Sequence, residues 1–193
     1  MKELNEAIRK WGKAIGKDVV KVDMFLNHRI DTALIFRMGE ELADRFASAR
    51  PDLILTVEAS GIALALACAR ALGNIPVVFA KKGSTVVQNE EMVTSKVYSF
   101  THKTENTIRV DRRYLPKGSR VLIVDDFLAD GQAVRGMTDL CVQAGCTVCG
   151  VGIGIEKGFQ SGGDTLRRQG TDLYSLAIVD HIDEKGNICL REA

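Results

Sequence analysis

The stretch Val121-Leu-Ile-Val-Asp-Asp-Phe-Leu-Ala-Asp-Gly-Gln-Ala133 decides the fold of this 193-residue chain. It opens as a continuous apolar run, reaches two adjacent carboxylates at Asp125 and Asp126, and turns through a glycine-containing loop into a helical pattern. Such an apolar run is typical of a strand buried on both faces of a parallel sheet. We therefore expect the strand to end at the acids and to place them at the sheet's carboxyl edge, where open α/β folds bind ligands.

Apolar runs and helical patterns alternate on both sides of this stretch. We expect strands at 53–57, 77–80, 120–124 and 147–155, a helix at 62–72 closed by Gly73, and a helix at 131–143 closed near Gly145. Two earlier helices are expected, one over 3–15 and one capped by Asp31 or Thr32 that runs to about Ala49. This alternation predicts an α/β fold with a central parallel sheet flanked by helices.

Three segments fall outside the alternation. Residues 93–100 together with 108–110 predict a β-hairpin arm, and 19–22 and 174–190 predict short extra strands that cap the carboxyl edge of the sheet. The whole chain, 1–193, is expected to form one domain. Its parts are a core of about 32–80 and 118–157, a small hood of about 1–31 and 158–193, and a flexible arm of about 83–112.

The balance of charge excludes some classes of partner. Lys and Arg number 26 against 25 Asp and Glu, so the net charge of +1 gives no long-range field that would gather nucleic acid or a membrane surface. The charged start lacks the apolar stretch of a signal peptide, and no later run reaches about 18 apolar residues. We expect a cytoplasmic protein with no nucleic-acid or membrane partner.

The five cysteines are an odd number and unevenly spaced, unlike the disulfide framework of a small secreted domain. Cys146 and Cys149 have a CxxC spacing, but no second pair and no histidine ligands lie near them in the sequence. Redox or metal chemistry there is the alternative to buried small hydrophobic side chains, which we favour. No residue is predicted to be a dedicated metal ligand.

The acid pair and its loop have a chemical interpretation of their own. Two carboxylates at a strand end accept hydrogen bonds from vicinal hydroxyls, as on a ribose. Backbone N–H groups in the loop and the positive end of the next helix suit a phosphate. The alternative is structural, because adjacent acids after a strand often only cap a helix or face solvent.

This segment resembles the signature of type I phosphoribosyltransferases, which binds phosphoribosyl pyrophosphate (PRPP). The stretches 21–31, 58–63, 97–101 and 155–159 are also similar to bacterial xanthine phosphoribosyltransferases, so the resemblance covers nearly the whole chain. It implies the type I fold, transfer of the phosphoribosyl group of PRPP to N9 of xanthine, and release of xanthosine 5′-monophosphate (XMP) and pyrophosphate. It also implies Mg²⁺ that binds with PRPP rather than in a dedicated protein cage, and a homodimer.

The resemblance also assigns roles to residues. Asp125 and Asp126 would hold the ribose hydroxyls. The PRPP-binding residues would be Ala129, Asp130, Gly131, Gln132 and Ala133 around the 5′-phosphate, and Ser60, Gly61 and Lys81 at the pyrophosphate. Seen without the resemblance, Ser60 is a helix cap, and Lys81 with Lys82 is a solvated surface pair. The chain departs from the family at Asp130 and Ala133, where hydroxyl side chains are usual, so phosphate binding is expected to rest on backbone donors, with Asp130 turned outward as a helix cap.

The base is expected against Val20, Asn27, Lys157 and Phe159, with Phe159 stacked on the purine. A lysine ammonium only donates hydrogen bonds, so Lys157 favours the oxo groups of xanthine or guanine over the amino group of adenine. From the residues alone, Phe159 is a loop aromatic and Lys157 a surface charge.

Alternatives remain for both the arm and the activity. The polar segment 83–104 is interpreted as a flap that excludes water from the reaction centre, and alternatively as a disordered arm or a dimer contact. Other bases, as in hypoxanthine-guanine or adenine transferases, are the first alternative function. A PRPP-sensing regulator without turnover is the second, although the near-neutral charge and the short segment before residue 18 speak against it.

Overall fold

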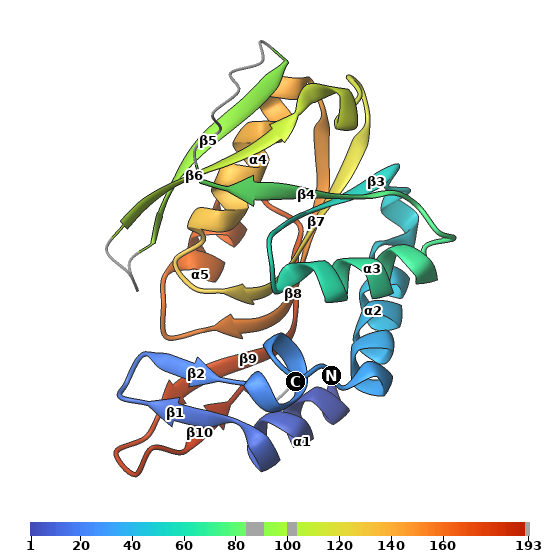
Figure 1. Ribbon diagram of the computed structural model, residues 1–193. Helices are drawn as coiled ribbons and strands as arrows, with labels where there is room; N and C mark the ends of the chain where they lie inside the picture. The colour runs from blue at the N-terminus through green and yellow to red at the C-terminus, as the bar shows by residue number, and fades with distance from the viewer. Residues whose placement is uncertain (84–90, 100–103, 192–193) are drawn as a thin grey trace.

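The protein is built around one mixed sheet, seen in a computed structural model that describes residues 1–83, 91–99 and 104–191 (Figure 1). Within these residues eight strands lie in the order β10-β9-β8-β7-β3-β4-β6-β5. The strands are β3 (Leu53–Val57), β4 (Val77–Lys82), β5 (Met92–Ser99), β6 (Thr104–Asp111), β7 (Arg120–Leu128), β8 (Thr147–Lys157), β9 (Leu173–Ile182) and β10 (Ile188–Leu190). Because the neighbours from β9 to β4 pair in parallel, the predicted α/β class is confirmed.

Helices cover both faces of the sheet, as Figure 1 shows. They are α2 (Thr32–Phe46) and α3 (Gly61–Ala71) on one face and α4 (Gln132–Ala144) on the other. Successive residues of β7 serve the two faces in turn: Leu122 and Val124 lie in the core with α2 and α3, and Val121 and Ile123 in the core with α4. A strand buried on both faces needs a continuous apolar run, which explains the sequence of β7.

Local signals set the helix ends as expected. The Asp31 carboxylate accepts a hydrogen bond from Leu34 N at 3.0 Å, which caps α2. Gly73 follows α3 and Gly145 closes α4, each with a positive φ (87° and 76°) that only glycine adopts without strain. Short 3₁₀ turns follow α2 at Ala47–Ala49 and β6 at Arg112–Tyr114.

The predicted first helix is too long. Helix α1 spans Lys2–Trp11, and Gly12 is extended (φ −67°, ψ 144°), so the chain leaves the helix there. It enters a hairpin of β1 (Lys13–Ile15) and β2 (Val19–Lys21). A π-helix, Asp23–Asn27, leads on to α2. The apolar spacing continued past Trp11, but the backbone turned at the glycine.

The C-terminal segment was expected to add only short strands, and this is wrong. Strand β9 has 10 residues and extends the main sheet by pairing in parallel with β8, after the short helix α5 (Gly162–Arg168). Only β10 is short, and it pairs with β9 in the antiparallel sense. Helix α1 packs against β9 and β10 (Figure 1), and the Met1 amino group donates to Leu176 O at 2.5 Å. The N-terminal helix and the last two strands therefore meet at one end of the sheet.

The expected hairpin arm is confirmed by the antiparallel pair β5 and β6. The arm joins the main sheet through Lys81 and Lys82 of β4, which pair with Arg109 and Ile108. Residues 84–90 and 100–103 lie outside the described residues, so a flap over the site stays a prediction. No helix among the described residues is both long and apolar enough to span a bilayer.

The cap of α2 gives a test of the local folding signals. Replacing Asp31 by Ala removes the acceptor for Leu34 N, and the free energy of unfolding should fall by about 1 kcal/mol. Urea denaturation of the purified protein measures this. Asp44→Ala, an exposed change on the same helix, is the control and should leave stability nearly unchanged; equal effects of the two changes would contradict the capping role.

Candidate active site

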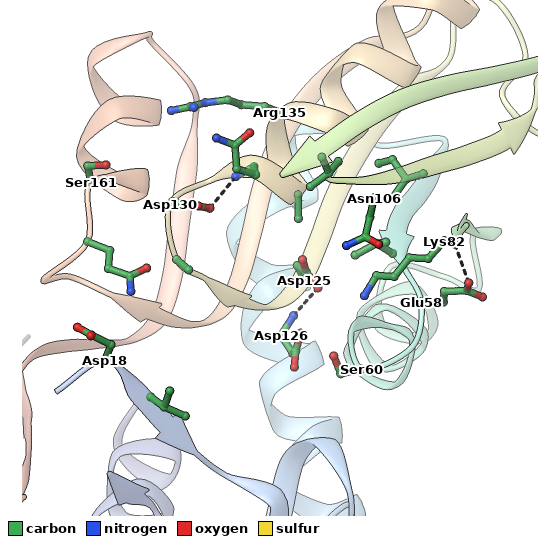
Figure 2. A pocket seen from close by; sticks show the side chains of 18 residues that line it. Asp18, Glu58, Ser60, Lys82, Asn106, Asp125, Asp126, Asp130, Arg135 and Ser161 are labelled. Atoms are coloured by element: carbon green, nitrogen blue, oxygen red, sulfur yellow. Dashed lines mark hydrogen bonds between the residues drawn. The ribbon is translucent and has the colours of Figure 1, made fainter. Parts of the chain in front are cut away.

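A cavity of about 920 Å³ lies at the carboxyl ends of the central strands (Figure 2). Its wall comes from β7 and the loop after it, the loop after β3, the end of β4, the β5–β6 arm, the β1–β2 turn and the segment before α5. Parallel strands bring their carboxyl ends to one edge, so segments far apart in the sequence meet there. The cavity therefore lies at the sheet edge where the site is predicted.

The acid pair lies on this wall, nearly covered by protein: Asp125 is 4% exposed and Asp126 6%. The strand was expected to end at the acids, and this is wrong. It continues to Leu128, because β8 pairs with it that far. On the other side, pairing with β3 ends at Ile123. The acids therefore stay in regular strand geometry while one flank of β7 opens to the cavity.

Burial controls the charge of Asp125. It raises the pKa of Asp125 well above its ordinary value, and the neighbouring Asp126 carboxylate raises it further. Asp125 also accepts a hydrogen bond from Asp126 N at 3.0 Å. Because donors to a carboxylate favour its ionised form, a ligand that brings hydroxyl groups or a cation to Asp125 would draw it toward the charged state.

The loop after β7 forms the next part of the wall. Ala129, Asp130, Gln132 and Ala133 line the cavity, and Gly131 (φ 84°) turns the chain into α4. The Asp130 carboxylate accepts from Gln132 N at 3.2 Å, but the N-cap residue of α4 is Gly131, so the expected role of Asp130 as the helix cap is wrong. Asp130 does not leave the cavity, and its contact occupies one of the backbone donors at the helix start.

The loop after β3 faces the acids. Ser60 lines the cavity and makes no side-chain cap on α3, so the alternative of a simple helix cap is wrong. Gly61, at the start of α3, is buried beside Asp125: a Cβ there would lie 2.7 Å from Asp125 Oδ1. The Glu58–Ala59 peptide bond in this loop is cis.

The lysine on the wall is Lys82, not Lys81 as expected. Successive residues of a strand point to opposite sides, so only one of the two can face the cavity. The backbone N–H of Lys82 donates to Glu58 Oε1 at 2.6 Å. Figure 2 shows the Lys82 ammonium group directed toward the acid pair.

The four residues expected around the base are not among the described residues that line the cavity. Val20 is buried in β2, and Asn27 is exposed at the end of the π-helix. Phe159 packs against the core formed with α2 and α3. Their neighbours Val19 and Gln160 do line the cavity.

Lys157, the fourth, is half-buried at the end of β8. Its ammonium group donates to Asp18 O in the β1–β2 turn at 2.9 Å. Burial lowers the pKa of Lys157, while the nearby carboxylates of Asp18 and Asp130 oppose that shift. With two further N–H donors, the ammonium group can still bind a second acceptor.

Helix α5 supports the loop from outside the cavity. Gly162 N donates to Ala129 O at 3.2 Å. The helix is held to β8 by Arg167, which binds both oxygens of Glu156 at 2.7 and 2.6 Å, and Ser175 donates to the same carboxylate at 2.5 Å. Although burial opposes ionisation of Glu156, these donors keep its pKa below the usual range.

Several lining residues have no role predicted from the sequence, among them Asn106, Arg135 and Ser161. Arg135 follows Gln132 by three residues on α4. Residues three apart lie on the same side of a helix, so the predicted position of Gln132 at the helix start also indicated Arg135. Asn106 comes from the arm, and Ser161 from the segment before α5. Their positions depend on long-range strand pairing, for which the sequence carries no local signal.

Other candidate chemistry finds little support in the described chain. There, no group of three or more His, Cys, Asp or Glu side chains is placed to hold a metal. The thiols are free, and burial raises the pKa of Cys141 to about 12 and also raises the pKa values of Cys146 and Cys149. Because thiolates are the reactive form, the CxxC pair fits the favoured structural interpretation.

The raised pKa of Asp125 predicts a dependence of stability on pH. The folded protein binds this proton more tightly than the unfolded chain, whose pKa is about 3.9, so the group's contribution falls as pH rises above about 4 toward the folded pKa. Asp125→Asn removes this loss. Thermal unfolding without ligand at about pH 5 and about pH 8 should show the variant gaining on the parent at the higher pH. Parallel behaviour of the two, or an equal gain in the exposed control Asp44→Asn, would refute the assignment.

Comparisons with known proteins agree with this geometry. The family model of the phosphoribosyl transferase domain matches residues 21–160. A xanthine phosphoribosyltransferase of Bifidobacterium adolescentis is 50% identical over 192 residues, covering 99% of this chain and 100% of that protein. One of Clostridioides difficile is 46% identical over 95% of this chain and 96% of its own.

A solved structure shares the fold as well. Adenine phosphoribosyltransferase from Giardia lamblia, complexed with 9-deazaadenine, aligns with a TM-score of 0.76 over 91% of this chain and 96% of that one. Its identity of 20% shows a likeness of fold alone. Together with the long, close matches in sequence, these findings show that the chain belongs to the phosphoribosyl transferase family.

Proposed function

We propose that this protein transfers the 5-phosphoribosyl group of PRPP to N9 of xanthine, giving XMP and pyrophosphate, as a purine-salvage enzyme. The observation that carries the proposal is the single cavity that joins the buried acid pair to the glycine-containing loop before α4. The acid pair suits the hydroxyl groups of a ribose, and the loop that follows it directly in the chain suits a phosphate. The names of the relatives, up to 50% identical over almost the full chain, support xanthine as the base.

In this proposal PRPP lies along the cavity. Asp125 and Asp126 accept hydrogen bonds from the ribose hydroxyls, and the loop 129–133 holds the 5′-phosphate. The pyrophosphate lies toward Ser60 and Gly61, with Lys82 taking the role first given to Lys81 because it is the lysine on the wall. A cation there balances charge as the pyrophosphate leaves.

Xanthine would enter between the β1–β2 hairpin and the end of β8. Lys157 donates to an oxo group of the base, and Asn27 offers both a donor and an acceptor. Phe159 and Val20 belong to the proposal as apolar surface for the ring, although neither is among the residues that line the cavity. Since Lys157 already binds Asp18 O, the same side chain connects the N-terminal hairpin to the base site.

The reaction breaks the bond from C1′ to the pyrophosphate oxygen and forms the bond from C1′ to N9, while the N9 proton passes to solvent. The sugar gains oxocarbenium character between these events. Asp125 and Asp126 fix the ribose, and their negative charge stabilises the developing positive charge on it. Positioning of the base opposite the leaving group supplies most of the remaining acceleration.

The residues present fit Mg²⁺ that arrives with PRPP. Mg²⁺ keeps several waters and takes one or two protein carboxylates together with substrate phosphates, and Asp125 and Asp126 are the carboxylates that would hold it here. When bound, it neutralises charge on the leaving pyrophosphate.

We further propose, from the family resemblance, a homodimer that works in the cytoplasm.

An assay with four bases tests the function. Purified protein is mixed with PRPP, MgCl₂ and xanthine, guanine, hypoxanthine or adenine, and nucleotides are separated by chromatography. We expect XMP as the fastest product, and at least about a hundredfold lower rate from the Asp125→Asn, Asp126→Asn double variant. No product from any base would overturn the proposal. Faster use of guanine would leave the transferase activity standing but refute the roles of Asn27 and Lys157.

Gly61 limits how the acid pair can move, which gives a second test. A Cβ at residue 61 would lie 2.7 Å from Asp125 Oδ1 and closer still to Thr56 Oγ1. Gly61→Ala should therefore displace the carboxylate and lower kcat/KM for PRPP by about a hundredfold, because small misplacements at a reacting centre cost that much. Leu66→Ala, a change on the exposed side of α3, is the control. Parental activity in Gly61→Ala would contradict the proposed role of Asp125.

A further inference from the structure

Arg135 is a cation on the cavity wall that no described contact explains. It lies in the first turn of α4, three residues after Gln132, and lines the cavity. Figure 2 shows its side chain extending from α4 in the direction of Ser161. In the part of the chain that the structure describes, its Nε is buried and has no hydrogen-bond partner. A buried donor without an acceptor is costly, so a ligand that supplies an acceptor is expected.

The charges around the cavity point to the kind of ligand. Among its described lining residues are five carboxylates and two cations, Lys82 and Arg135. Lys82 comes from the end of β4, and Arg135 from the helix after β7, so they lie on different sides of the acid pair (Figure 2). A ligand with phosphate groups at both ends meets one cation at each end.

The loop before α4 needs such a donor. Its side chains, from Ala129 to Ala133, include no hydroxyl group and no cation. The Asp130 carboxylate faces the cavity and takes the N–H of Gln132, one of the donors at the helix start. A phosphate here would meet a negative charge and a reduced set of backbone donors. The nearest group of the right charge along the chain is the Arg135 guanidinium.

We propose that Arg135 binds the 5′-phosphate of PRPP and of the nucleotide product, so that a guanidinium supplies the positively charged donors that the loop's own side chains lack. A guanidinium is suited to this role because its planar fork binds two phosphate oxygens at once and stays charged at every working pH. This inference rests on the proposed function, since it identifies the monophosphate end of the substrate.

Arg135→Gln tests the role, with Arg135→Lys as the conservative variant and Arg168→Gln as the matched control. Arg168 is exposed on α5, does not line the cavity, and loses the same charge. We expect Arg135→Gln to raise KM for PRPP about ten- to a hundredfold, as for the loss of a charge-assisted hydrogen bond. KM for xanthine and kcat at saturation should stay close to the parental values, Arg135→Lys should recover part of the loss, and Arg168→Gln should behave as the parent.

Direct binding separates this inference from the proposed function. Calorimetry with ribose 5-phosphate, and separately with magnesium pyrophosphate, needs no turnover. Arg135→Gln should weaken the binding of ribose 5-phosphate by a similar factor and leave the affinity for magnesium pyrophosphate unchanged. The melting temperature of the protein should also stay unchanged. Unchanged ribose 5-phosphate affinity would overturn the role of Arg135, and equal weakening of both ligands would reduce it to a general effect of charge. Absence of nucleotide product in the parent would count against the transferase, not against this contact.

Discussion

Two adjacent carboxylates buried in one parallel strand are the constraint on which the rest of this structure depends. Asp125 and Asp126 are almost covered, and a buried charge is stable only where polar groups or a ligand compensate it. β8 pairs with β7 beyond the acids, whereas the pairing of β3 with β7 ends at Leu55 and Ile123, so the pair is held in the strand and still meets the cavity. The raised pKa of Asp125 follows directly from this placement. Carboxylates buried so that they can bind sugar hydroxyls are therefore destabilising when no ligand supplies hydrogen-bond donors.

The parts of the fold that could be predicted are those with local causes. Continuous apolar runs identified the buried strands, and Asp31, Gly73 and Gly145 identified helix ends, because caps and positive φ angles act within a few residues. The errors arose where a distant partner decided the outcome. β7 continues to Leu128 because β8 pairs with it, and the C-terminal segment joins the main sheet because β8 offers it an edge. The helix over 3–15 failed at Gly12, where the apolar spacing continued without a helical backbone.

The same division explains the site. The acid pair, the loop after it and Ser60 stand in short motifs, so the sequence was enough to bring them to one cavity. The choice of Lys82 over Lys81 depends on which side of β4 faces the cavity. Side chains alternate between the two sides of a strand, so this choice can be made only when the register of β4 in the sheet is known. Asn106 reaches the wall through the pairing of the arm, and no pattern near it in the sequence announces that. Motifs therefore identify the chemistry, while tertiary pairing completes the set of residues.

The phosphate loop owes its position to residues far along the chain. A Cβ on Gly162 would lie 2.6 Å from Gly131 N, so α5 packs its backbone directly against the loop. Glu156, in β8, holds α5 through Arg167. Lys157, which follows Glu156 in the same strand, binds the β1–β2 turn beside the cavity. The end of β8 thus fixes both the wall proposed for the phosphate and the wall proposed for the base. Because one strand sets the distance between the two, the span available to a substrate is a property of the sheet rather than of either motif.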